Sequence, residues 1–275
     1  MTICIATWCY ENANVHNARI VLGTDWRISG FLGRSDTLFK QPAIVRGTYR
    51  CLIAGNPNDF RPLVKLIDGE LVSVSAIDEV TAIPAIRAAL NRRHRERVDE
   101  YCQAHFSMSY DELLRIGRTQ LPDESYRRAI SRTELIRLWA CVIVAGFGKD
   151  GLPVIVRSTE DCEAFFDEGF SVIGDGSSLA QASLLSREVG EIDALEKSIY
   201  AVYEALRAAT HIASVSDTRT ITVLYPDGTY KVVSPNGYAK LADHYAAFGP
   251  KEIPDKPELP PDALMSLPTQ KPLDT

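Results

Sequence analysis

TICIATWC at residues 2–9 and ARIVLGT at residues 18–24 are the two stretches of this sequence that decide its fold. Both are rich in apolar and β-branched residues, and a polar segment at residues 10–14 separates them, so they predict two strands joined by a turn. The first strand begins directly after Met1, with neither a basic leader nor a long apolar segment before it. We therefore expect no signal peptide and a cytoplasmic protein.

Other predicted strands follow this pair in two groups, each succeeded by helices. The first group comes after a glycine-containing turn at residues 28–34 and lies at residues 38–40, 42–45 and 49–54. The second group lies at residues 140–145, 153–157, 162–166 and 170–173, with a final hairpin at residues 220–225 and 229–233. The sequence predicts helices at about residues 60–67, 80–102, 177–187 and 192–211, and a charged helical excursion at about residues 107–138.

The order of these elements predicts the fold class. Strands that succeed one another as hairpins, instead of alternating singly with helices, favour antiparallel sheets covered by helices over a parallel nucleotide-binding sheet. We expect an α+β domain over residues 2–235. From residue 249 onward seven prolines occur in 27 residues, which predicts a poorly ordered or extended tail over residues 249–275.

Composition argues against several classes of function. The net charge of −6 disfavours nucleic-acid binding, and we interpret the basic run at residues 92–97 as a solvated helix face or a subunit contact. No apolar run reaches the roughly 18 residues that a membrane span needs. The six cysteines form no CxxC pair and the five histidines no HExxH spacing, so we predict no metal site and no cofactor.

The glycine-rich segment GFGKDG at residues 146–151 matches the GxGxxG pattern of dinucleotide-binding loops. That pattern binds a pyrophosphate where it opens a helix, because the helix N-terminus supplies the N–H groups. Here LPVIV at residues 152–156 follows, and these residues predict a strand. We interpret the segment as a hairpin loop.

Thr2 is the candidate nucleophile. Methionine followed by a small residue is normally removed, which would leave Thr2 with a free α-amine whose reference pKa is about 7.7–8.0. A residue with both a hydroxyl and such an amine carries its own nucleophile and general base. Many cytoplasmic proteins begin with Met-Thr, so Thr2 alone is weak evidence for a nucleophile. The residues that follow it must support this role.

A series of motifs follows Thr2 in a fixed order. LGTDWR at residues 22–27 ends a strand with Asp25 and Arg27, Lys40 lies 15 residues beyond Asp25, and CLIAG at residues 51–55 ends in Gly55 before a helix. The hairpin at residues 146–151, the turn GDGS at residues 174–177 and the end of the last long helix at residues 208–216 complete the series. From residue 2 to about residue 233 this order resembles the proteasome β-subunit family of N-terminal-nucleophile hydrolases, including its bacterial ancestral β-subunit relatives.

The resemblance implies a four-layer αββα sandwich of two antiparallel sheets and a role for each matching residue. Thr2 would be the nucleophile, with its α-amine as the general base. Lys40 would stabilise the developing alkoxide, Asp25 would form an ion pair with Lys40, and Arg27 would support this cluster. The backbone N–H of Gly55 would donate to the oxyanion. The alternative for Asp25, Arg27 and Lys40 is a surface salt bridge at the end of a strand.

Departures from the family pattern concern the groups around the amine and the cleft. The family's aspartate after the last helix falls on Ala213 and its serine on Ser216, whereas Asp175 replaces the serine of its glycine-rich turn. Our hypothesis is that Asp175 polarises the amine in place of the missing aspartate, assisted by Ser177 and Ser216. In addition, Trp26 stands where the family has a small serine.

The resemblance implies a threonine endopeptidase that cleaves a polypeptide substrate without a cofactor, through an acyl-enzyme intermediate. Family members form homo-oligomeric rings or ring-like assemblies, so we expect such an assembly, with an unfoldase as a candidate partner and with no contact to nucleic acid or a membrane. Two alternatives stay open. One is a scaffold subunit that keeps the fold but lacks turnover, and the other is an amidase that acts on a small molecule with the same N-terminal machinery.

Overall fold

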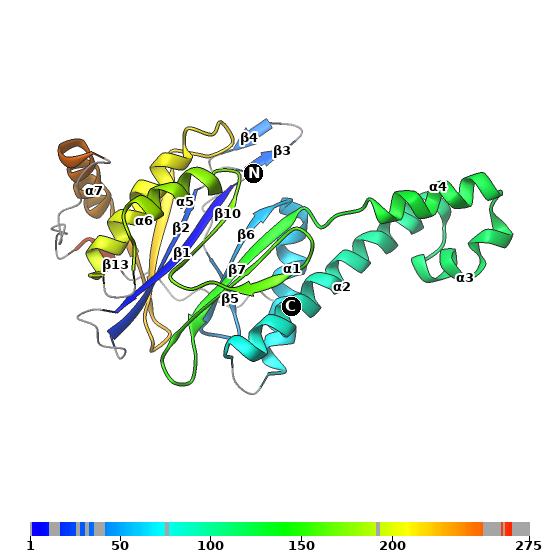
Figure 1. Ribbon diagram of the computed structural model, residues 1–275, viewed down its shortest axis with the longest axis horizontal. Helices are drawn as coiled ribbons and strands as arrows, with labels where there is room; N and C mark the ends of the chain where they lie inside the picture. The colour runs from blue at the N-terminus through cyan, green and yellow to red at the C-terminus, as the bar shows by residue number, and fades with distance from the viewer. Residues whose placement is uncertain are drawn as a thin grey trace.

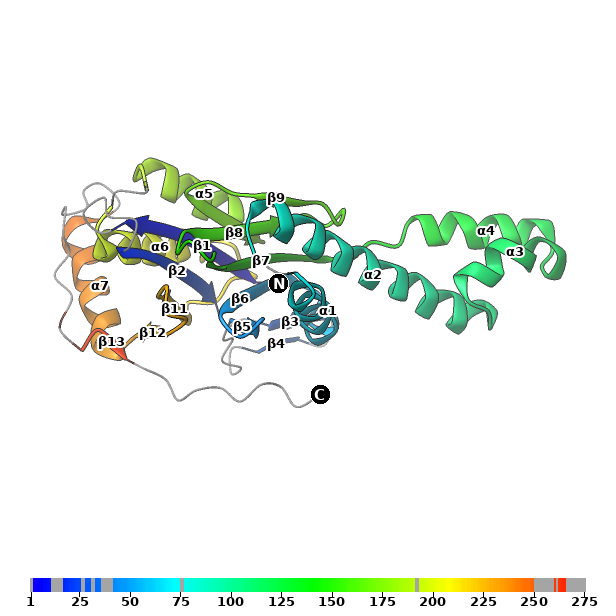
Figure 2. The same ribbon diagram turned by 90° about the horizontal axis from the view of Figure 1, so that it is seen from below.

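The computed structural model describes residues 2–10, 17–25, 28–30, 33–35, 42–74, 77–190, 193–249, 260 and 262–265. It shows an α+β fold built on two antiparallel sheets (Figures 1 and 2). The first sheet has six strands in the order β10-β1-β2-β11-β12-β13. Their bounds in chain order are β1 Ile3–Tyr10, β2 Ala18–Asp25, β10 Phe170–Gly174, β11 Arg219–Leu224, β12 Tyr230–Val233 and β13 Leu264–Met265.

The second sheet has five strands in the order β5-β6-β7-β8-β9, and every neighbouring pair in it is antiparallel. Their bounds are β5 Ala43–Val45, β6 Tyr49–Gly55, β7 Ala140–Phe147, β8 Pro153–Ser158 and β9 Ala164–Phe166. The predicted turn at residues 28–34 instead contains a separate antiparallel pair of short strands, β3 (Ile28–Gly30) and β4 (Gly33–Ser35).

Alternating side chains of β1 show how the layers pack. Ile3 and Ile5 lie in a core cluster with residues of α5 (Ser177–Ser186) and α6 (Leu195–Ala209), on the outer face of the first sheet. Cys4 and Ala6 point the other way, into a cluster between the two sheets that includes Ile143 of β7. A further cluster joins the outer face of the second sheet to α1 (Phe60–Val72) and α2 (Glu79–Phe106). The layers therefore run helices, sheet, sheet, helices (Figure 1).

The predicted α+β class and the antiparallel sheets are confirmed. The hairpin interpretation of residues 146–151 is also confirmed, because β7 pairs directly with β8 and no helix follows the glycines. A short 3₁₀ helix, η3 (Pro57–Asp59), precedes α1 where the sequence predicts a helix start. The Asn56 side chain accepts a hydrogen bond from the Asn58 N–H at 3.0 Å and so caps it.

A helical projection extends away from the sheets and carries its own small core. It consists of the C-terminal part of α2 with α3 (Tyr110–Gln120) and α4 (Asp123–Glu134), and we call residues 98–136 the arm (Figures 1 and 2). Val98, Cys102 and Leu113 are among the buried residues that pack its helices together. The predicted helical excursion thus corresponds to α3 and α4. Helix α2 is long, but many of its residues are charged. In the part of the chain that the structure describes, no helix is both long and apolar enough to cross a membrane.

Helix α7 (Pro235–Phe248) was not predicted, and it extends the packed chain beyond the predicted boundary at residue 235. Ser234 caps its N-terminus by accepting a hydrogen bond from the Gly237 N–H at 3.1 Å, and Pro235 occupies the first helical position. Leu241 of α7 is fully buried in the cluster formed by the first sheet and α6. Within the proline-rich segment, β13 pairs with β12 and forms the edge of the first sheet.

Candidate active site

Thr2 and Asp25 meet where β1 begins and β2 ends. The register of these antiparallel strands places Cys4 opposite Thr24, which brings the residues just beyond them together. The Thr2 hydroxyl donates a hydrogen bond to Asp25 Oδ1, and the Ile3 N–H donates to the same oxygen at 3.0 Å. Thr2 is 4% exposed and Asp25 is 0% exposed. A buried carboxylate without donors would be strongly unfavourable, so these bonds fix the position of the Thr2 hydroxyl.

The loop between α6 and β11 supplies a third donor to Asp25. The backbone N–H of Ser216 donates to Asp25 Oδ2 at 2.9 Å, and Ser216 itself is buried. Its hydroxyl accepts a hydrogen bond from the Thr218 N–H at 3.0 Å, which shapes the loop. Sequence reasoning placed Ser216 near the Thr2 amine, but it did not predict that the Ser216 backbone binds Asp25. No local pattern indicates this contact, because 191 residues separate the two partners.

The turn after β10 lies against the backbone of Thr2. The Asp175 N–H donates to the Thr2 carbonyl oxygen at 3.1 Å. Gly174 has a φ of +101°, and a Cβ atom at this position would lie 1.8 Å from the Thr2 oxygen. Only glycine therefore allows β10 to approach the start of β1 this closely. The predicted turn at residues 174–177 is thus adjacent to Thr2, as the resemblance implies.

Asp175 and Ser177 have their side chains in a half-buried position at the start of α5. Among the described residues, the Asp175 carboxylate forms no hydrogen bond or ion pair, and its contact with Thr2 is made by its backbone. Gly176 lets this turn pack on α6, because a Cβ atom there would lie 2.5 Å from the Ala209 Cβ. The role of Asp175 and Ser177 toward the amine stays a prediction.

Gly55 ends β6 in the second sheet, and its neighbour Ala54 links it to the Thr2 region. The Ala54 Cβ lies 3.2 Å from the position that a Cβ on Gly174 would occupy. Gly55 has a φ of +128°, and a Cβ atom on it would lie 2.1 Å from the Trp139 carbonyl oxygen. The sequence prediction that a glycine ends this strand beside the site therefore has a steric reason.

Arg27 and Lys40, the two cations predicted beside Thr2, lie outside the described residues, as do Met1 and Trp26. The predicted ion pair between Asp25 and Lys40 is therefore an expectation. The structure adds that Asp25 also binds Thr2, Ile3 and Ser216, which the resemblance alone did not indicate.

Other nucleophilic and metal-binding chemistry has little support elsewhere in the described part of the chain. Burial raises the pKa of the Cys51 thiol to about 12 and that of the Cys141 thiol to about 11, so both are protonated near neutral pH. No group of three His, Cys, Asp or Glu side chains among the described residues is arranged to hold a metal ion. The Thr2 hydroxyl bonds to a buried carboxylate, whereas the similar pairs Thr81–Asp78 and Thr229–Asp227 are exposed.

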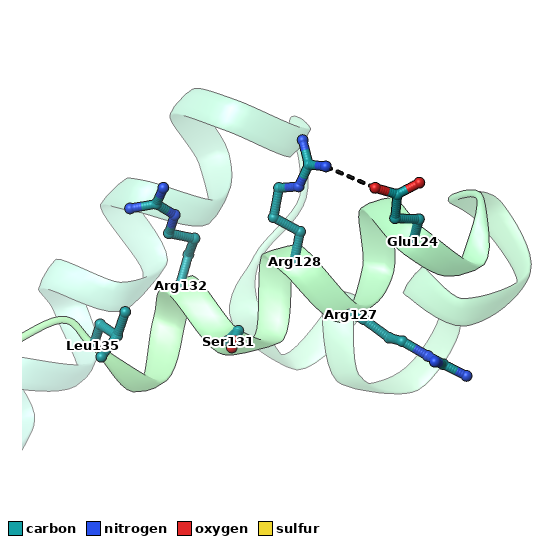
Figure 3. Close-up of a pocket in the computed structure, with 6 residues that line it drawn as sticks. All are labelled: Glu124, Arg127, Arg128, Ser131, Arg132 and Leu135. Atoms are coloured by element: carbon teal, nitrogen blue, oxygen red, sulfur yellow. Dashed lines mark hydrogen bonds and ion pairs between the residues drawn. The ribbon is translucent and has the colours of Figure 1, made fainter.

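Two shallow surface pockets lie away from these residues. The pocket on α4 is lined by Glu124, Arg127, Arg128, Ser131, Arg132 and Leu135. Figure 3 shows that its arginines do not converge: Arg128 points to Glu124, with which it forms a 2.8 Å ion pair, and Arg127 points away from both. The second pocket lies between α1 and α2 and mixes basic and acidic side chains such as Lys65, Arg92 and Glu96. Neither arrangement forms a convergent binding site.

Comparison with known proteins adds no assignment. The sequence matches no family model, and no curated protein matches it.

Proposed function

We propose that this chain is a threonine-type N-terminal-nucleophile hydrolase of the proteasome β-subunit type, with the αββα sandwich of that family, and that it cleaves peptide bonds with Thr2. The observation that carries the proposal is the convergence of distant segments on Thr2. Its hydroxyl donates to Asp25 at the end of β2, and its carbonyl oxygen accepts from the Asp175 N–H after β10. Asp25 is bound in turn by Ser216, which precedes β11.

In the proposed reaction, removal of Met1 comes first, because the Thr2 nitrogen is an amide while Met1 is attached. The freed amine accepts the hydroxyl proton as Oγ1 attacks the carbonyl carbon of the substrate peptide bond. The carbon–nitrogen bond then breaks, the amine gives the proton to the leaving nitrogen, and the acyl group stays on Oγ1 as an ester. Water, deprotonated by the same amine, hydrolyses the ester and restores Thr2.

The remaining residues act on the position and charge of this nucleophile. Asp25 orients the Thr2 hydroxyl through its direct hydrogen bond. The Gly55 N–H is the proposed oxyanion donor, since β6 ends next to the turn that contacts Thr2. The roles of Lys40 and Arg27 are those that the resemblance implies: positive charge that favours the developing alkoxide.

The decisive experiment combines intact-mass measurement with covalent labelling. We expect the purified protein to lack Met1 and to form an adduct with an epoxyketone, which reacts with both the hydroxyl and the amine of an N-terminal threonine. Peptide mapping should place the adduct on Thr2. The Thr2→Ala variant should form none, and Thr7→Ala, which alters a hydroxyl further along β1, should still be labelled. Retention of Met1 would contradict the proposal.

A second candidate is a non-catalytic scaffold subunit, and the burial of Thr2 favours it. Only 4% of Thr2 is exposed, so its hydrogen bond to Asp25 could serve a purely structural role at the end of the sheet. The same bond would orient the hydroxyl if Thr2 is a nucleophile. A folded protein that lacks Met1 but forms no epoxyketone adduct would support the scaffold. If the adduct forms, hydrolysis of fluorogenic peptides measured beside simple amides separates a peptidase from a small-molecule amidase.

A further inference from the structure

Trp139 is a large apolar side chain that stays exposed next to the candidate site. It is 61% exposed, although the residues on either side of it, Leu138 and Ala140, are each 1% exposed. An exposed indole beside a binding site is a common source of binding energy, because it offers a large apolar area with few rotatable bonds. The surroundings of Trp139 decide what it can bind.

The backbone of Trp139 adjoins Gly55, the proposed oxyanion donor. Its carbonyl oxygen accepts a hydrogen bond from the Asn56 N–H at 2.8 Å. The same oxygen would lie 2.1 Å from a Cβ atom on Gly55. The Asn56 side chain caps η3, so it is already committed to the local structure. The backbone of Trp139 therefore lies beside the end of β6, next to the proposed oxyanion position.

The side chains around the start of β7 show where the indole does not pack. Leu138, Ala140 and Val142 all belong to the core cluster on the helix-covered face of the second sheet. Cys141 packs on the cluster between the two sheets, which contains Ala54 of β6. Trp139 lies just before β7, between two residues of the helix-side core, and is itself exposed, so its indole lies outside that core and beside the end of β6.

We propose that Trp139 forms one wall of the substrate cleft and binds an apolar side chain of the polypeptide next to the bond that Thr2 cleaves. This inference rests on the proposed function. The backbone of Trp139 supports Gly55 and Asn56 whatever the side chain is, whereas the exposed indole contacts the substrate and lowers KM. Trp139 binds the substrate and takes no part in the proton transfers.

The kinetic test uses the full-length protein and two fluorogenic peptides that differ only in the residue before the scissile bond, leucine or glycine. For the leucine peptide, Trp139→Ala should raise KM by about tenfold and change kcat by less than about twofold. Trp139→Phe should restore most of the loss. Leu135→Ala, which removes a side chain that is 67% exposed four residues earlier, should leave KM unchanged. Equal KM values for Trp139→Ala and Leu135→Ala would overturn the inference.

A binding test separates this inference from the proposed function. Intrinsic fluorescence is followed as the leucine peptide is added to the Thr2→Ala protein, which lacks the proposed nucleophile. Trp26→Phe is added to both proteins and Trp8 is 7% exposed, so we expect the change to come from Trp139 and to vanish in Thr2→Ala/Trp26→Phe/Trp139→Phe. Persistence of the change in that triple variant would contradict the role of Trp139. Failure of epoxyketone labelling of Thr2, with the Trp139-dependent binding intact, would instead contradict only the proposed function.

Discussion

Where β1 begins, the Asp25 carboxylate is completely buried and accepts hydrogen bonds from the Thr2 hydroxyl and from the N–H groups of Ile3 and Ser216. On the arm, Glu124 and Arg128 form an ion pair one helical turn apart, with side chains 86% and 71% exposed. Both arrangements pair a carboxylate with donors, but only on the arm can water replace a lost partner. The buried hydrogen bonds of Asp25 therefore fix how the ends of the strands meet, whereas the exposed ion pair on the arm mainly keeps the surface of α4 soluble in water.

Gly174→Ala should have the largest effect, because the new Cβ would overlap the Thr2 carbonyl oxygen and φ is positive. We expect the free energy of unfolding to fall by about 5 kcal/mol, measured by urea denaturation, together with loss of Thr2 labelling. Gly151→Ala is the matched control, since φ is +78° there and, its chain neighbours aside, no atom of the described residues lies within 4 Å of the added Cβ. Its loss should be only about 1 kcal/mol. Similar losses in both variants would show that β10 does not confine Thr2.

Asp25→Ala should follow, because it leaves three buried donors without their acceptor. We expect a loss of about 3–4 kcal/mol in the free energy of unfolding and no reaction of Thr2 with the epoxyketone. Asp175→Ala is the control at the same end of the sheet, since its carboxylate has no hydrogen bond among the described residues. Its stability should change by less than about 0.5 kcal/mol. An Asp25→Ala protein as stable as this control would contradict the buried network.

Arg93→Ala tests the buried ion pair that joins α2 to η3, just before the arm begins. Arg93 Nε lies 2.9 Å from Asp59 Oδ1, and their side chains are 7% and 1% exposed. Removal of Arg93 should lower the free energy of unfolding by about 2–3 kcal/mol, because the ion pair left to Asp59 among the described residues is the longer one to Arg97, at 3.8 Å. Arg92→Ala removes the neighbouring arginine, whose side chain is 64% exposed, and should have little effect. Equal thermal midpoints for the two variants would show that the buried pair of Arg93 and Asp59 contributes no more to stability than an exposed arginine.

Arg128→Ala should have the smallest effect. Its partner Glu124 stays in water, so the expected change in stability is within about 0.5 kcal/mol and should shrink further at high salt. Circular dichroism during thermal unfolding at two salt concentrations measures it, and Glu124→Gln serves as the matched partner variant. A loss above about 1 kcal/mol in the free energy of unfolding would show that this exposed ion pair stabilises the arm, as the buried bonds of Asp25 stabilise the site.

Local signals were sufficient for most of the elements. The β-rich runs, the glycine turns and the helix caps predicted most strands and most helices within a few residues, because these signals act through neighbours along the chain. The helix α7 was missed although its signal was present: Ser234 followed by Pro235 is a typical helix start. The short strands β3 and β4 were not predicted because a glycine-containing segment of that length also suits a simple turn.

For the candidate site, the sequence by itself determined which residue types are present and in what order: Thr2 ahead of a strand, Asp25 at the end of the next strand, and glycines at residues 55 and 174. The tertiary structure alone decided which groups meet. Asp25 binds Ser216 across 191 residues, the Asp175 backbone rather than its carboxylate contacts Thr2, and Trp139 adjoins Gly55. Such contacts depend on sheet register and on packing between layers, and these are set by the burial of apolar faces far apart in the sequence.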